Sequence, residues 1–105
     1  MQDQERREHA RVPFVVPVNV SYNRNTLKGF WTHDVSEGGL RLEFLPIPIS
    51  TRVKLIVPIG NDSSAHHHVV DAEVVWRTFK TTGIRFIDPP DEVLEFIRRA
   101  VKQFN

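Results

Sequence analysis

The sequence contains no cysteine and no long uninterrupted run of apolar residues. The missing cysteines exclude disulfide scaffolds, thiolate-bound zinc, iron–sulfur clusters and thiol catalysis together. No secretory signal or membrane span is predicted, because no stretch approaches the roughly 18 consecutive apolar residues that a span needs. We therefore expect a cytoplasmic protein.

An excess of charge of one sign is also missing. Fourteen Lys and Arg residues stand against 13 Asp and Glu residues, which leaves a formal net charge of +1. No strong overall field is thus available to attract a nucleic-acid polymer, and we expect none among the partners. With 105 residues, 40% of them hydrophobic, the chain has the size and composition of one small folded domain.

The first eleven residues differ from the rest of the chain. They hold three acidic residues and three arginines, and Met1 is their only large apolar residue. Such a segment buries too little surface to offset its ordering entropy. We expect residues 1–11 to form a mobile arm unless a partner holds them, followed by a β-domain at 12–87 and a helix at 88–105.

Alternating apolar and polar residues predict six short strands with no helical pattern between them. The strands are bounded by turn-forming Asn, Gly and Pro residues. They are expected at residues 12–22, 26–34, 39–44, 52–57, 69–77 and 82–87, with a polar loop at 60–68. We predict an all-β fold, a six-stranded antiparallel β-barrel, because an open sheet of this size would leave its edges exposed.

The C-terminal segment has a helical pattern. Asp88-Pro89-Pro90 is typical of a helix start, and acidic residues follow in the first turn while basic residues fill the last turns. Apolar residues then recur at helical spacing, at Val93, Leu94, Phe96, Ile97, Ala100, Val101 and Phe104. We predict one C-terminal α-helix whose apolar stripe packs on the barrel or forms a dimer seam.

Two groups of polar residues stand out from this framework. Arg7 and Arg11 are four residues apart where the arm meets the first strand, and Arg6 precedes them. The second group is Asp34-Val35-Ser36-Glu37-Gly38-Gly39, between two predicted strands. Taken alone, the first is an ordinary charged terminus and the second an ordinary tight turn.

Taken together, Arg-x-x-x-Arg followed by Asp-x-Ser-x-x-Gly on an all-β pattern resembles the PilZ domain, a bacterial receptor module for cyclic di-GMP. Leu40-Arg41-Leu42 and the runs Glu-Val-Val-Trp-Arg at 73–77 and Gly-Ile-Arg-Phe at 83–86 are also similar to strands of this family. The resemblance implies a PilZ-like barrel with a C-terminal helix, cyclic di-GMP as ligand, no catalysis and no cofactor. It also implies control of motility, exopolysaccharide or biofilm formation through a protein effector that remains unidentified.

The residue types suit this ligand, which carries two phosphodiesters and two guanines. A guanidinium can bind a phosphate bidentately or pair with the O6 and N7 edge of guanine, so Arg7 and Arg11 are the first candidates. Lysine in their place would keep the positive charge but lose the planar, forked arrangement of N–H donors that a guanidinium has. Asp34 can accept hydrogen bonds from the N1 and N2 donors of a guanine.

Four further residues complete the candidate site. Ser36 supplies a hydroxyl, and the backbone of Gly38 and Gly39 can approach a phosphate closely and point N–H groups at it. Trp76 either stacks near a guanine or belongs to the core. We expect Trp31 and the phenylalanines in the core.

Arg6 bears on the number of ligands. The resemblance implies that cyclic di-GMP binds as one molecule or as a stacked pair, and an arginine just before the first motif arginine is expected for the pair. Two molecules carry about four negative charges, which three arginines balance better than two. These points favour the stacked pair.

Metal and enzyme chemistry are not expected. His66, His67 and His68 are adjacent, so they alternate in direction in an extended chain, and no carboxylate cluster accompanies them. Successive strand residues such as His33 and Asp34 point to opposite sides, so they cannot both face one substrate. No pattern resembles a nucleophile elbow or an oxyanion hole.

Two other functions stay open. A PilZ-like adaptor would bind only proteins, although such members have lost the arginines that this chain keeps. A small barrel for single-stranded nucleic acid would need a basic groove, and the net charge argues against one. We expect a monomer or a weak dimer.

Overall fold

The computed structural model describes residues 10–59 and 66–104; Arg6, Arg7 and the rest of the predicted arm before residue 10 lie outside the described residues. The elements of the described part are β1 (Val12–Pro13), β2 (Pro17–Tyr22), β3 (Asn25–Ser36), β4 (Gly39–Glu43), β5 (Arg52–Ile59), β6 (His66–Arg77), β7 (Thr81–Phe86) and α2 (Asp91–Phe104). No helix in this part is long and apolar enough to cross a membrane.

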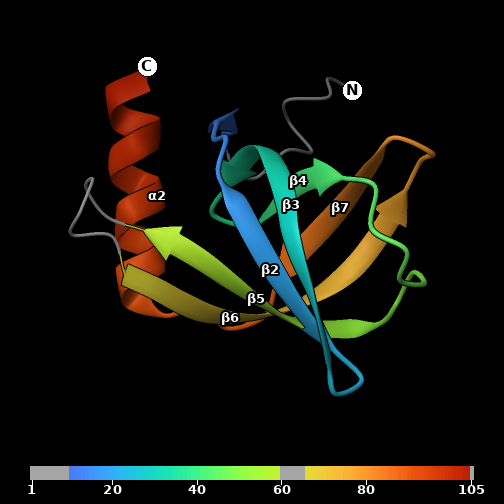
Figure 1. The fold of residues 1–105 in the computed structure, drawn as a ribbon. Helices are drawn as coiled ribbons and strands as arrows, with labels where there is room; N and C mark the ends of the chain where they lie inside the picture. The colour runs from blue at the N-terminus through green and yellow to red at the C-terminus, as the bar shows by residue number, and fades with distance from the viewer. Residues whose placement is uncertain (1–9, 60–65, 105) are drawn as a thin grey trace.

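Six of the strands close into a barrel. They follow the order β3-β2-β5-β6-β7-β4 with antiparallel neighbours, and β4 pairs back with β3 to complete the ring (Figure 1). The two residues of β1 add to β3, where Val12 lies opposite Val35. The predicted six-stranded antiparallel barrel with a C-terminal helix is confirmed.

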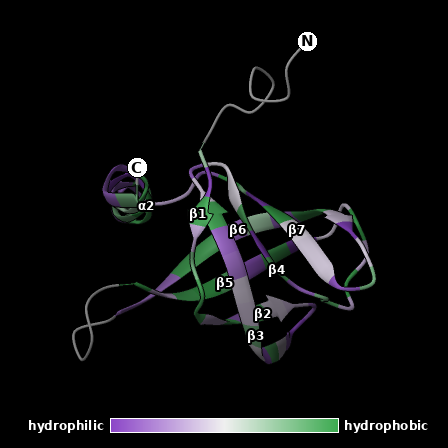
Figure 2. Cartoon of the chain, turned by 90° about the horizontal axis from the view of Figure 1, so that it is seen from above, coloured by the Kyte–Doolittle hydropathy of each residue, from purple (hydrophilic) through white to green (hydrophobic). Residues whose placement is uncertain are grey.

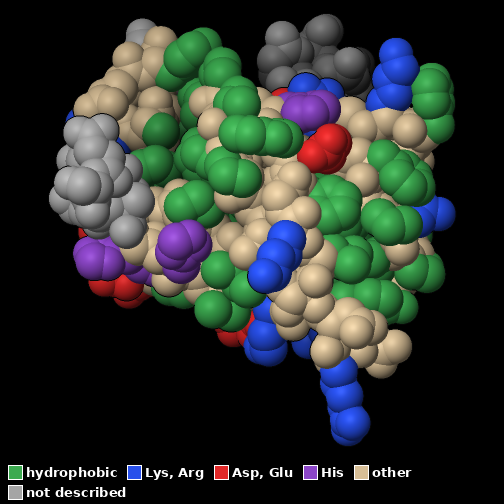
Figure 3. All heavy atoms as spheres, in the orientation of Figure 1, with side chains coloured by type: hydrophobic (Ala, Val, Ile, Leu, Met, Phe, Trp, Pro, Cys, Tyr) green, Lys and Arg blue, Asp and Glu red, His purple; other side chains and the backbone are tan. Residues whose placement is uncertain are grey.

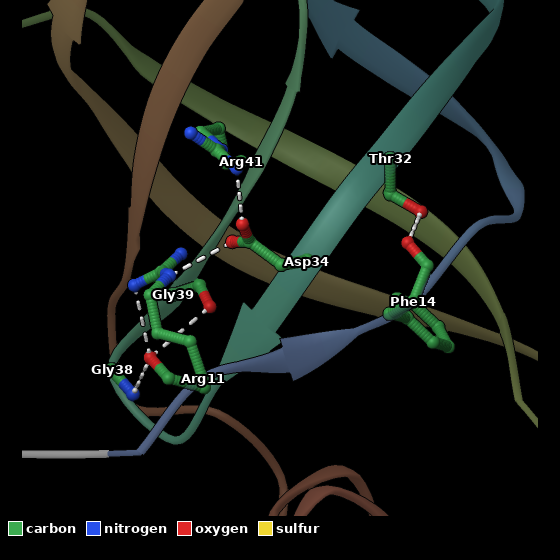
Figure 4. A network of polar contacts seen from close by, with 8 residues as sticks. Arg11, Phe14, Thr32, Asp34, Gly38, Gly39 and Arg41 are labelled. Atoms are coloured by element: carbon green, nitrogen blue, oxygen red, sulfur yellow. Dashed lines mark hydrogen bonds and ion pairs between the residues drawn. The ribbon is translucent and has the colours of Figure 1, made fainter.

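The predicted first strand is interrupted, and Thr32 of β3 fills the break. Residues 14–16 separate β1 from β2. The Thr32 hydroxyl oxygen accepts a hydrogen bond from the Val16 amide at 2.9 Å, and the hydroxyl donates to the Phe14 carbonyl (Figure 4). Apolar and polar residues keep alternating through the break, so the sequence pattern could not reveal that the strand is interrupted.

The interior of the barrel is apolar, as the alternation predicts. Inward side chains come from β2 to β7 and include Val18, Val20, Leu40, Leu42, Val53, Leu55, Val70, Val74 and Ile84, each less than 5% exposed. Burying a side chain of this kind stabilises the fold by about 1.5–3 kcal/mol relative to leaving it exposed. Because the inward positions hold the fold together, the alternate, outward positions are available for a binding site.

The expectation that Trp31 and the phenylalanines lie in the core is wrong for several of them. Trp31 is 50% exposed because its neighbour Thr32 takes the inward position, and Phe79 is 83% exposed in the β6–β7 turn. Phe44 follows the end of β4, and its ring lies 5.4 Å from the guanidinium carbon of Arg77. Figure 3 shows apolar side chains spread over the surface where the β4–β5 connection and the β6–β7 turn lie.

The predicted polar loop at 60–68 is shorter than expected. His66, His67 and His68 belong to β6 and lie opposite Ile59, Pro58 and Val57 of β5. Residues 60–65 of that loop are outside the described part of the chain. Within the described ranges, no group of three His, Cys, Asp or Glu side chains could hold a metal ion.

The helix α2 packs against its own barrel. It begins directly after Pro89-Pro90, and its Val93 and Ile97 are each 2% exposed. Phe96 meets Phe14 edge to face, with ring centroids 5.9 Å apart. Figure 2, which views the helix end-on, shows it standing beside the barrel. The apolar stripe of the helix therefore packs on the barrel, which is one of the two roles predicted for it.

Candidate functional site

Arg11 brings the two predicted motifs together. Its Nε donates a hydrogen bond to Oδ1 of Asp34 at 2.8 Å, and its Nη1 donates to Oγ of Ser36 at 3.3 Å (Figure 4). Arg11 can reach both because it directly precedes β1, and β1 pairs with the end of β3 through Val12 and Val35. Residues more than 20 positions apart in the sequence therefore share one site.

Ser36 organises the turn that follows β3. Its hydroxyl oxygen accepts a hydrogen bond from the Gly38 amide at 3.2 Å and lies 3.4 Å from the Gly39 carbonyl oxygen, to which the hydroxyl donates. The side chain is buried beneath Arg11, and Ser36 as a whole is 2% exposed. The turn is held further by the Phe86 amide of β7, which donates to the Gly38 carbonyl at 2.9 Å. In this structure Ser36 fixes both the turn and Arg11.

Two cross-strand rows of residues run over β3, β4, β7 and β6 beside this turn. Neighbouring strands pair Asp34, Arg41, Gly83 and Trp76 in the first row, and Ser36, Gly39, Arg85 and Glu73 in the second. Asp34 and Ser36 flank the buried Val35, so both rows lie on the outer face of the barrel. This face is the floor of the candidate site.

Trp76 joins the first row because β6 is irregular. The expected alternation places Trp76 inward with Val74, but the register between these two residues shifts against β7, and Trp76 is 42% exposed. Its indole lies against Gly83, where an added Cβ would come within 2.2 Å of the ring. Only a glycine at 83 leaves room for the ring in this position. Trp76 therefore lies in the site and not in the core.

The site is a cleft of about 890 Å³, a size usual for small-molecule sites. Every predicted site residue in the described part of the chain lines it, namely Arg11, Asp34, Ser36, Gly38, Gly39 and Trp76. Arg6 and Arg7, the other two predicted site residues, lie outside the described residues.

Arginines dominate the charge of the cleft. Arg11, Arg41 and Arg85 line it, and Asp34 is the only carboxylate among its described lining residues. Glu73, beside Arg85 in the second row, forms an ion pair with that arginine. Oδ2 of Asp34 lies 2.6 Å from Nη2 of Arg41, so this carboxylate is held between two guanidiniums. Nε of Arg41 is buried and has no hydrogen-bond partner in the described part of the chain. The remaining excess of positive charge suits an anionic ligand.

Sequence reasoning missed Arg41, Arg85 and Gly83 as parts of the site. A signal for Arg41 was available: a two-residue turn between Ser36 and Gly39 places Arg41 opposite Asp34. Arg85 and Gly83 gave no such local signal, because their place depends on β7 lying between β4 and β6. β6 and β7 are consecutive in the sequence, but the pairing of β4 with β7 joins distant parts of the chain.

Solved structures show the same fold at low sequence identity. The inhibitor of motility MotI (DgrA) of Bacillus subtilis matches 98% of this chain and 52% of its own with a TM-score of 0.78 and 13% identity. The PilZ domain of CeSA from a cellulose-synthesizing bacterium matches 90% of this chain and 97% of its own, with a TM-score of 0.68 and 16% identity. YcgR of Escherichia coli, solved in complex with c-di-GMP, matches 94% of this chain and 46% of its own, with a TM-score of 0.67 and 20% identity.

These matches differ in how much of each protein they span. The chain covers about half the length of MotI and of YcgR and nearly all of the CeSA domain. No curated protein sequence matches the chain. The family model of the PilZ domain matches residues 5–103, which include both motifs, the barrel and nearly all of α2. This chain therefore belongs to the PilZ domain family.

Proposed function

We propose that this chain is a non-catalytic receptor of cyclic di-GMP that binds the nucleotide in the cleft and signals to a protein effector. The observation that carries the proposal is the pair of hydrogen bonds from Arg11 of the first motif to Asp34 and Ser36 of the second. The arginine-rich lining of the cleft supports an anionic ligand. Membership of the PilZ family and the likeness to YcgR, which was solved with c-di-GMP, support this particular anion.

The contacts follow from the chemistry of each side chain. Arg7 and Arg11 bind phosphate oxygens or the O6 and N7 edge of a guanine with their forked donors. Asp34 accepts from N1 and N2 of a guanine, and the backbone at Gly38 and Gly39 approaches a phosphate. Trp76 offers its exposed indole face for stacking on a guanine.

The signal arises from the segment that precedes the barrel. Arg11 is fixed at the start of β1, so Arg7 lies at most about 14 Å of extended chain away, within reach of the cleft. The part of the arm before Arg11 becomes ordered over the ligand, while the barrel domain and the C-terminal helix α2 serve as the scaffold. Ordering of this segment changes the surface that an effector meets.

A calorimetric titration of the full chain with cyclic di-GMP tests the proposal. We expect saturable binding, with GMP as a control that brings one guanine and one phosphate. A folded sample that gives no heat and no thermal shift up to about 50 µM ligand would instead indicate an adaptor that binds only proteins. Binding of a single-stranded oligonucleotide that collapses with salt and is not displaced by cyclic di-GMP would indicate a nucleic-acid-binding barrel.

Arg6→Ala tests whether the ligand binds as a stacked pair. We expect the stoichiometry to fall from about two molecules per chain toward one, because the variant loses one of the three arm arginines that balance the roughly four negative charges of the pair. The measurement is the equivalence point of the same titration. Arg24→Ala, in the exposed β2–β3 turn, is the control for losing one positive charge. An unchanged equivalence point would remove Arg6 from the site.

A further inference from the structure

The helix α2 contacts both segments that form the cleft. Nε of Arg98 donates a hydrogen bond to Oε1 of Glu37 at 3.0 Å. Glu37 lies between Ser36 and Gly38 in the second motif, residues 34–39, which form the motif turn. On the other side, Phe96 packs edge to face on Phe14, which is three residues beyond Arg11. The helix thus bridges the Arg11 segment and the motif turn.

The cleft and the helix contact share a layer of buried residues. Leu40 and Phe86 line the cleft and also line the apolar contact with Val93 and Ile97 of α2. Only about 10 Å³ of space remains in that contact, which is at the limit of what a water molecule needs. Because the layer is close-packed, a shift of the helix displaces the wall of the cleft.

We propose that docking of α2 and binding of the ligand stabilise each other, with Arg98 as a positioning residue for the motif turn. The inference rests on the proposed function, since it concerns the same cleft. The ligand needs the Arg11 segment and the motif turn side by side, and the docked helix contacts both segments in that arrangement. Helix and ligand therefore favour the same conformation, and thermodynamic linkage makes the effect reciprocal.

Two neighbouring arginines of the helix provide a matched pair of variants. Arg98 pairs with Glu37, whereas Arg99 is exposed and has no ion pair with any described residue. We expect Arg98→Gln to raise the dissociation constant for cyclic di-GMP roughly two- to fivefold, the range for an exposed ion pair, and Arg99→Gln to leave it unchanged. The double variant Glu37→Arg with Arg98→Glu should recover most of the affinity, because it restores the pair with its charges exchanged.

Hydrogen exchange of the full chain measures the reciprocal effect. Cyclic di-GMP should slow amide exchange in residues 91–104 of the unchanged protein and of Arg99→Gln, and should slow it less in Arg98→Gln. A merely structural role of Arg98 would leave the ligand-dependent part of the exchange unaltered. Equal affinities in the two variants, with no ligand effect on residues 91–104, would overturn the proposal.

A comparison without ligand separates this inference from the proposed function. If the helix holds the motif turn, residues 34–39 exchange faster in Arg98→Gln than in Arg99→Gln before any nucleotide is added. Should the unchanged protein fail to bind cyclic di-GMP, the proposed function falls, and this comparison still decides whether Arg98 holds the turn. Equal exchange of residues 34–39 in both variants would refute the link.

Discussion

Arg11→Ala is expected to weaken cyclic di-GMP binding at least about a hundredfold while the barrel stays folded. The guanidinium already makes two hydrogen bonds within the protein, to Asp34 and Ser36, and we expect two more from its remaining N–H groups to the ligand. Hydrogen bonds of charged groups are each worth about 1.5–3 kcal/mol. Two such contacts to the ligand sum to roughly 3–6 kcal/mol, and each 1.4 kcal/mol is tenfold in affinity. The side chain is 36% exposed, so its loss removes little core packing. Calorimetric titration measures the affinity, and circular dichroism checks the fold.

Two further substitutions make the result specific. Arg11→Lys keeps the charge but cannot form the fork, so we expect it to recover only a small part of the affinity. Arg24→Ala removes the same charge in the exposed β2–β3 turn, at the end of the barrel away from β1 in Figure 1, and should bind normally. Normal binding by Arg11→Ala would show that the ligand site lies elsewhere.

Local sequence patterns carry most of the information about the barrel. A period of two marks the strands because inward and outward positions alternate, as Val53, Leu55 and Val57 of β5 do. The pattern fails where the backbone departs from that period. Near the end of β6 the register shifts after Val74, so Trp76 leaves the inner face.

The candidate site was only partly predictable, because its residues meet across strands. The resemblance to a family identified a set of residues that all line the cleft, namely Arg11, Asp34, Ser36, Gly38 and Gly39. It did not identify Arg41, whose contact with Asp34 depends on the register of β3 against β4. Arg85 is further from local reasoning, since its place in the cleft depends on the pairing of β7 with β4, where its neighbour Gly39 is distant in sequence. Long-range strand order therefore limits what the sequence predicts about such a site.

Gly39→Ala is expected to destabilise the fold by about 3 kcal/mol, the upper part of the range for overpacking a close contact. A Cβ at residue 39 would lie 1.9 Å from the Ile84 carbonyl oxygen, and the next nearest atoms also belong to the backbone of β7. A backbone neighbour cannot turn aside as a side chain can, so β4 and β7 must separate. For a domain of this size the loss corresponds to a fall in melting temperature of roughly 12–24 °C, measurable by circular dichroism.

Gly29→Ala provides the contrast, because its cost has a different cause. Gly29 has a φ of 78° and open space around its Cα, so alanine there meets only the strain of the left-handed region, about 1–2 kcal/mol. If Gly39→Ala melts no lower than Gly29→Ala, the close contact between β4 and β7 is wrong. If it melts lower, weak cyclic di-GMP binding by Gly39→Ala will reflect a displaced strand as well as a lost phosphate contact. Gly39, the glycine of the Asp-x-Ser-x-x-Gly motif, then also stabilises the barrel, because it lets β4 lie against β7 under the cleft.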